Sequence, residues 1–186
     1  MTWLAYRFLR LRGWTFHGSL PRVEKMIVIG APHTTNWDFV AFLAARWAYK
    51  MEARFLAKHG LFRWPFGYLF TALGGIPVGG SRSGGVVGQV AKVFDDAEHV
   101  TLVIAPEGTR ASVPYWKSGF LKIAEATAAP VVLAAVDFPR REVTIGPTID
   151  LRGNVPGFMD QARDFYADKE GLHPRLKGPI QVRNES

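Results

Sequence analysis

Two polar clusters in this sequence contain the residue types needed for acid–base chemistry on a hydroxyl group. The first, PHTTNWD, places Asp38 five positions after His33. If Asp38 accepts a hydrogen bond from Nδ1–H of the imidazole, it fixes the tautomer and leaves Nε2 free to take a proton from a substrate. The pair would then act as a base and its orienting group, without a protein nucleophile. The alternative interpretation is structural: a turn histidine that caps a carbonyl, and an acidic residue at a helix start.

The second cluster, PEGTR, combines groups that suit an anionic ligand. Gly108 permits a sharp turn, while Thr109 and Arg110 supply a hydroxyl and a planar set of N–H donors that match a phosphate. Glu107 would hold Arg110 or accept a hydrogen bond from a substrate hydroxyl. Taken alone, this cluster is also typical of a surface turn whose charges pair with each other.

Both clusters follow short apolar segments with the composition of buried strands, 26–31 and 99–105. We also expect strands at 53–57, 76–78, 131–137 and 142–145, the last two antiparallel, and helices at 36–51, 61–73, 86–94, 118–127 and 156–168. This alternation predicts a single α/β domain over residues 1–186, with a mostly parallel or mixed sheet and helices on both faces. Ligands of such sheets bind beyond the carboxyl ends of the strands, which is where both clusters lie.

In this order and spacing, the clusters resemble the H-x4-D and E-G-T-R motifs of the glycerolipid acyltransferases, the 1-acylglycerol-3-phosphate acyltransferase-like family. Other segments agree with the family pattern. LGGIPV at 73–78 resembles its second motif, APVV at 129–132 its fourth, and WKSGF at 116–120 follows the E-G-T-R turn. The resemblance covers about residues 25–150 and implies the family's α/β fold.

The resemblance also implies a reaction. His33 would be the general base that deprotonates the acceptor hydroxyl, and Asp38 would orient it. The activated oxygen would attack the thioester carbonyl of acyl-CoA or acyl-carrier protein directly, without an acyl-enzyme. Residues 107–110 would hold the acceptor, a lysophospholipid or a glycerol-phosphate-like molecule. No metal or bound cofactor is expected.

One position departs from the family pattern. Where the second motif usually ends in an acidic residue and an arginine, Val78 is followed here by Gly79 and Gly80. Arg82, two residues late, is our candidate for the missing cation, and Lys117 is a second. Because this arginine is expected to contact the acceptor phosphate, an amine or a non-glycerol alcohol stays open as an alternative acceptor.

The composition restricts the compartment and the partners. Among 186 residues there are 23 Lys and Arg against 16 Asp and Glu, a formal net charge of +7, and no cysteine. Disulfides, thiolate metal sites and cysteine nucleophiles are therefore excluded. The positive charge favours an anionic partner such as a membrane surface, and we expect no nucleic acid because no binding motif for it is present. A second hypothesis is accordingly a non-catalytic, basic, membrane-binding protein.

Residues 1–20 are expected to contain a basic, aromatic helix. Leu4, Phe8 and Leu11 would share one stripe among arginines, which suits either a helix lying in a membrane interface or one packed on the domain. No segment is apolar and long enough to span a bilayer. We therefore expect a cytoplasmic protein, peripheral on the cytoplasmic face of the membrane.

Two further segments carry expectations that the structure addresses. The aromatic segment 61–70 (LFRWPFGYLF) is interpreted as core, with contact to an acyl chain or to lipid as the alternative. The segment 171–186 contains prolines and a polar end, and we expect a weakly ordered tail.

Overall fold

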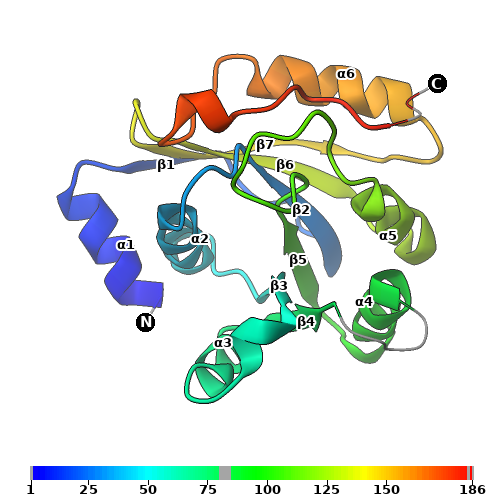
Figure 1. Cartoon of the computed structure of the whole chain (residues 1–186), viewed down its shortest axis with the longest axis horizontal. Coiled ribbons are helices and arrows are strands. Elements are labelled where there is room, and N and C mark those ends of the chain that lie inside the picture. The colour runs from blue at the N-terminus through cyan, green and yellow to red at the C-terminus, as the bar shows by residue number, and fades with distance from the viewer. Residues whose placement is uncertain (1, 80–84, 184, 186) are drawn as a thin grey trace.

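Seven strands form one sheet in the part of the chain that the computed structural model describes, residues 2–79, 85–183 and 185 (Figure 1). The strands are β1 (Thr15–His17), β2 (Lys25–Ala31), β3 (Ala53–Lys58), β4 (Gly75–Val78), β5 (Val100–Ile104), β6 (Val131–Asp137) and β7 (Glu142–Ile149). Their order is β1-β7-β6-β2-β5-β3-β4, and all neighbours are parallel except β6 and β7. The predicted fold class is confirmed, and only the short edge strand β1 was not expected.

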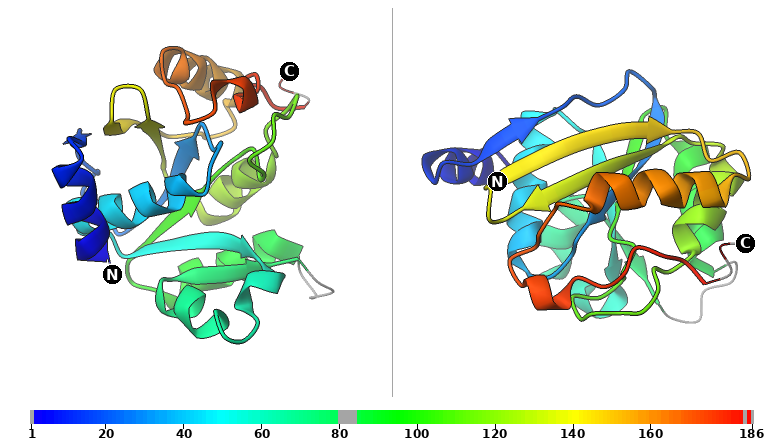
Figure 2. Two further views of the ribbon diagram at one scale, coloured as in Figure 1. Left: turned by 60° about the vertical axis from the view of Figure 1, so that its left-hand side comes forward. Right: turned by 90° about the horizontal axis from the view of Figure 1, so that it is seen from above.

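Helices cover both faces of this sheet. They are α1 (Thr2–Leu11), α2 (Trp37–Ala48), α3 (Gly67–Ala72), α4 (Gly85–Asp96), α5 (Gly119–Thr127) and α6 (Val155–Tyr166), with 3₁₀ turns η1 (His59–Phe62) and η2 (Pro174–Leu176). Figures 1 and 2 show α1, α2 and α3 on one side of the sheet and α4, α5 and α6 on the other. We call these the α1–α3 layer and the α4–α6 layer.

The central strand β2 is apolar on both faces because both layers pack on it. Ile27 and Ile29 belong to the core cluster beneath α4, α5 and α6. Met26 and Val28 belong to a second cluster on the opposite face. This two-sided burial explains the unbroken apolar run in the sequence.

The register of β2 and β5 determines where the polar clusters lie. The two strands are parallel, with Ile29 beside Ile104, so their carboxyl ends meet at one edge of the sheet. The loop after β2 carries His33, and the loop after β5 carries Glu107. The β2–α2 and β5–α5 loops therefore leave the sheet side by side.

The expected helix over 61–73 is broken. The structure has the 3₁₀ turn η1, an irregular stretch through Pro65, and then the short helix α3, because proline cannot continue the backbone hydrogen bonds of a helix. The interpretation of this segment as core is wrong for Trp64, Phe66 and Tyr68, which are exposed. Phe62 is half-buried.

Residues 171–183 run across both loops instead of forming the loose tail that we expected. The His173 N–H donates to Thr34 Oγ1 at 3.3 Å. The Trp116 N–H donates to the Gln181 carbonyl at 2.8 Å, and Trp116 pairs with Val182 in a parallel bridge. These contacts mostly use backbone groups, so they leave no periodic side-chain pattern in the sequence.

No helix in the described ranges has both the length and the apolar character needed to cross a bilayer.

Candidate active site

His33 and Asp38 form a hydrogen-bonded pair in the β2–α2 loop. His33 Nδ1 lies 2.9 Å from Asp38 Oδ2. The same oxygen accepts the backbone N–H groups of Thr34 and Thr35, each at 3.0 Å. A carboxylate oxygen held by three donors requires the imidazole proton on Nδ1, which leaves Nε2 as the acceptor. The sequence predicted this pair, and the loop folds back as it requires.

Glu107 joins the two loops at their base. Its Oε1 accepts the His33 backbone N–H at 3.0 Å, and the residue is buried. Burial raises the pKa of the Glu107 carboxyl, while its hydrogen bonds and the nearby imidazole oppose that rise. Thus Glu107 holds the His33 backbone. We expected it to hold Arg110 or a substrate hydroxyl, but within the described residues it has no hydrogen bond or salt bridge with Arg110, which instead binds Asn36.

Arg110 forms a second bridge between the loops. Its guanidinium donates to Asn36 Oδ1, on the residue just before α2. Arg110 is otherwise exposed, so its remaining N–H donors face outward. Asn36 was not singled out from the sequence, although its place inside the H-x4-D cluster was the available signal. Thr109 Oγ1 accepts the Ala111 N–H at 3.3 Å, which closes the turn.

Gly108 and Lys117 lie against each other. Gly108 has φ +63°, and a Cβ there would lie 2.6 Å from Lys117 Nζ and 2.7 Å from its Cε. The Lys117 N–H donates to the Pro106 carbonyl at 2.8 Å. The lysine stem therefore crosses the turn beside Gly108, whose positive φ favours glycine, and its ammonium group stays at the site. Arg82, the other candidate cation, lies outside the described residues.

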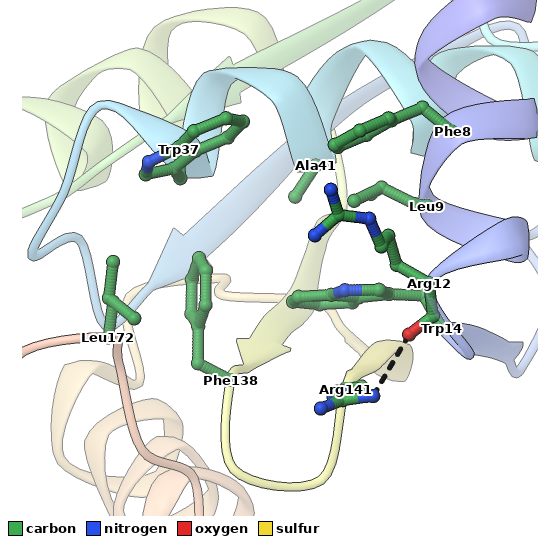
Figure 3. Close-up of a pocket in the computed structure, with 9 residues that line it drawn as sticks. All are labelled: Phe8, Leu9, Arg12, Trp14, Trp37, Ala41, Phe138, Arg141 and Leu172. Atoms are coloured by element: carbon green, nitrogen blue, oxygen red, sulfur yellow. Dashed lines mark hydrogen bonds between the residues drawn. The ribbon is translucent and has the colours of Figure 1, made fainter.

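A mainly apolar hollow of about 350 Å³ lies between α1, α2 and the β6–β7 turn. It is lined by Phe8, Leu9, Arg12, Trp14, Trp37, Ala41, Phe138, Arg141 and Leu172 (Figure 3). Phe8 and Trp37 stack with ring centroids 6.4 Å apart, and Trp14 meets Phe138 edge-on at 5.2 Å. Figure 3 shows Trp37 and Leu172 at the end beside the β2–α2 loop. The hollow therefore begins next to the loop that carries His33.

Within the described ranges, no three His, Asp or Glu side chains are grouped so that they could hold a metal ion. The chemistry available at this edge of the sheet is that of an imidazole base, two carboxylates and two exposed cations.

Comparison with known proteins agrees with this architecture. A family model described as acyltransferase matches residues 14–137. This range includes the β2–α2 loop and the β5–α5 loop. Among solved structures, the chain resembles the 1-acyl-sn-glycerophosphate (LPA) acyltransferase PlsC from Thermotoga maritima, with TM-score 0.60 and 18% identity, over 82% of this chain and 68% of that one. At this identity the likeness concerns the fold. No match was found among curated protein sequences.

Proposed function

The chain belongs to the acyltransferase family, and from this premise we propose that it acylates the hydroxyl group of a lysophospholipid or a glycerol-phosphate-like acceptor. The acyl donor would be a thioester, acyl-CoA or acyl-carrier protein. The observation that carries the proposal is the convergence of His33, Asp38 and Glu107 at the carboxyl ends of two neighbouring strands.

The proposed reaction is a direct transfer. His33 Nε2 takes the proton of the acceptor hydroxyl as the oxygen attacks the thioester carbonyl carbon. The carbon–sulfur bond then breaks, and the imidazolium returns the proton to the leaving sulfur. Asp38 stabilises the imidazolium and keeps its ring in place, as a triad carboxylate does. The step uses groups of this chain alone and needs no covalent enzyme intermediate.

Glu107 would support this chemistry indirectly. Its hydrogen bond to the His33 backbone holds the base in position, and its carboxylate lies close enough to the imidazole for their charges to interact. A buried negative charge near the ring favours the imidazolium that forms during transfer. Glu107 is therefore a positioning residue in this proposal.

The acceptor phosphate would bind the cations at the mouth of the site. Arg110 and Lys117 are exposed beside the β5–α5 turn, and neither has a salt bridge within the described part of the chain. Arg82 stays a candidate third cation. A guanidinium and an ammonium group suit a phosphate monoester. The name of the Thermotoga protein, an acyltransferase for 1-acyl-sn-glycerophosphate, supports the same choice.

The hollow beside Trp37 would take a fatty acyl chain. Its aromatic and aliphatic lining suits an alkyl chain, and its volume lies within the range of small-molecule sites. Because the substrates are lipids, we place the protein on the cytoplasmic face of the membrane.

The test is release of free CoA from one acyl-CoA by the purified chain, with His33→Ala as the blank. The acceptor panel contains lysophosphatidic acid, glycerol 3-phosphate, an uncharged monoacylglycerol and a lipid amine. We expect turnover with a phosphate-bearing alcohol and none above the blank with the amine. Equal turnover by His33→Ala would contradict the mechanism, and preference for the amine would contradict the acceptor.

A further inference from the structure

An exposed aromatic ridge lies on the crossover between β3 and β4. It consists of Leu61, Trp64, Phe66, Tyr68 and Leu69. Trp64 is 85% exposed and Tyr68 is 83% exposed. Large apolar side chains gathered this closely on a surface mark an interaction site more often than chance exposure does. Nothing in the proposed acyl transfer uses them.

The ridge is held firmly from its inner side. Phe62 and Phe70 turn inward, with ring centroids 6.1 Å apart, and Phe70 also meets Phe39 of α2 at 6.0 Å. A Cβ on Gly75 would lie 2.8 Å from both the Phe62 ring and the Phe70 carbonyl oxygen. The aromatic and aliphatic side chains of this segment thus divide into an anchoring set, Phe62 and Phe70, and an exposed set. The exposed rings therefore lie on a segment whose inner side chains are packed against the domain.

Exposed apolar side chains also occur elsewhere in the α1–α3 layer, but not on the helices of the opposite layer. Those on the helices beside the ridge are Trp3, Leu4, Phe8 and Leu11 on α1, and Trp37 and Trp47 on α2. Within the described residues, α4, α5 and α6 carry no exposed large hydrophobic side chain. Among the described helices, the exposed large hydrophobic side chains are therefore confined to the layer that contains the ridge.

The charge around the ridge has a single sign. No acidic residue occurs between Glu52 and Asp95 in the sequence. Arg54, Lys58 and Arg63 are exposed, and none of them has a salt bridge with a described residue. Such cations attract anionic lipid headgroups by about 1 kcal/mol each near a membrane surface.

We propose that the aromatic ridge docks the protein on an anionic bilayer, with Trp64, Phe66 and Tyr68 in the interfacial region and Lys58 and Arg63 against the headgroups. Tryptophan and tyrosine are the residues enriched at this depth, because their rings are apolar and their N–H and O–H groups are polar. The adjoining basic charge selects a lipid surface of negative sign. The hollow that begins next to the β2–α2 loop lies between α1 and α2, in the same layer as the ridge.

The test is co-sedimentation of the full-length protein with vesicles of phosphatidylcholine alone or mixed with phosphatidylglycerol. Trp64→Ser/Tyr68→Ser is expected to weaken partitioning into the mixed vesicles about tenfold or more, because two rings no longer leave water. The control Val23→Ser/Tyr115→Ser removes two exposed side chains outside the layer and is expected to bind normally. Arg63→Gln is expected to lower the preference for mixed over neutral vesicles about fivefold.

Fluorescence gives a second measurement on the same samples. Binding should shift tryptophan emission to shorter wavelength, and Trp64→Phe should lose much of that shift while it keeps most of the binding. Vesicle binding without a ridge effect, or binding lost only in Leu4→Ser/Leu11→Ser, would overturn the proposal and place docking on α1. Absence of wild-type binding to either vesicle would also overturn it. No acyl donor is present, so the result does not depend on whether the proposed reaction is correct.

Discussion

The loops around His33 and the aromatic ridge both belong to crossovers of the same sheet, yet their side chains differ in where they have partners. In the loops, Glu107 is buried and the Asp38 side chain is only 10% exposed, and one carboxylate oxygen of each accepts hydrogen bonds from neighbouring backbone groups. On the ridge, Trp64 and Tyr68 extend into solvent, and their side chains form no hydrogen bonds within the described chain. The loops therefore depend on internal partners for their geometry. The ridge needs an external partner for its apolar surface to leave water.

The largest effect is expected from the internal network. Asp38→Asn keeps the shape of the side chain but can donate an N–H to His33 Nδ1, which would put the imidazole proton on Nε2 and remove the base. We expect acyl transfer to fall by about 10²–10⁴-fold, measured as CoA release at saturating donor. The exposed Asp95→Asn is the control. Near-normal turnover in a folded Asp38→Asn protein would show that the network only holds the loop.

The turn at Gly108 should be the next most sensitive position. Gly108→Ala forces a side chain into positive φ and against Lys117, so we expect a loss of roughly 1–2 kcal/mol in unfolding free energy. Chemical denaturation measures it. Gly88→Ala in α4 is the matched control, since a Cβ there meets no atom within 4 Å and should stabilise the helix by roughly 0.5–1 kcal/mol. Equal effects of the two substitutions would contradict the positive φ at Gly108.

Glu107→Gln should separate stability from activity. Because burial raises the pKa of the folded carboxyl, ionising Glu107 costs the folded state stability as pH rises from the ordinary glutamate range through the raised pKa. Glutamine avoids this cost and still accepts the His33 N–H. We therefore expect a higher Tm than wild type at neutral pH, with the difference vanishing in acid, and about tenfold slower transfer. Thermal melts over a pH series measure it.

An exposed acid provides the control for that pH series. For Glu125→Gln, on the outer surface of α5, the difference in Tm from wild type should not change with pH. A Glu107→Gln advantage that persisted unchanged in acid would contradict the assigned direction of the pKa shift.

The smallest effect on stability is expected on the ridge. Trp64→Ala should change the unfolding free energy by less than about 0.5 kcal/mol, because the ring touches mainly solvent. Phe70→Ala, from the anchoring set, should cost about 2 kcal/mol. Denaturant titration of both variants measures the contrast. Similar losses of unfolding free energy in the two variants would contradict the division into exposed and anchoring side chains.

Much of the fold could be predicted because its strands are buried on both faces. The unbroken apolar runs of β2 and β5 and the polar residues directly after them predicted both the parallel sheet and the edge that carries His33. The partners of Glu107 and Arg110 could not be read in the same way. These partners depend on how two loops far apart in sequence lie against each other. The sequence alone does not identify which of several possible donors a carboxylate such as Glu107 will accept from.

The sequence by itself determined which groups can do chemistry and at which edge of the sheet they lie, because strand composition and local spacing are short-range properties. Only the tertiary structure decided that Trp64, Phe66 and Tyr68 face outward and that residues 171–183 cross the site. Apolar content cannot distinguish a buried ring from one left for a partner, and backbone hydrogen bonds leave no mark on residue type. Long-range packing settled both points.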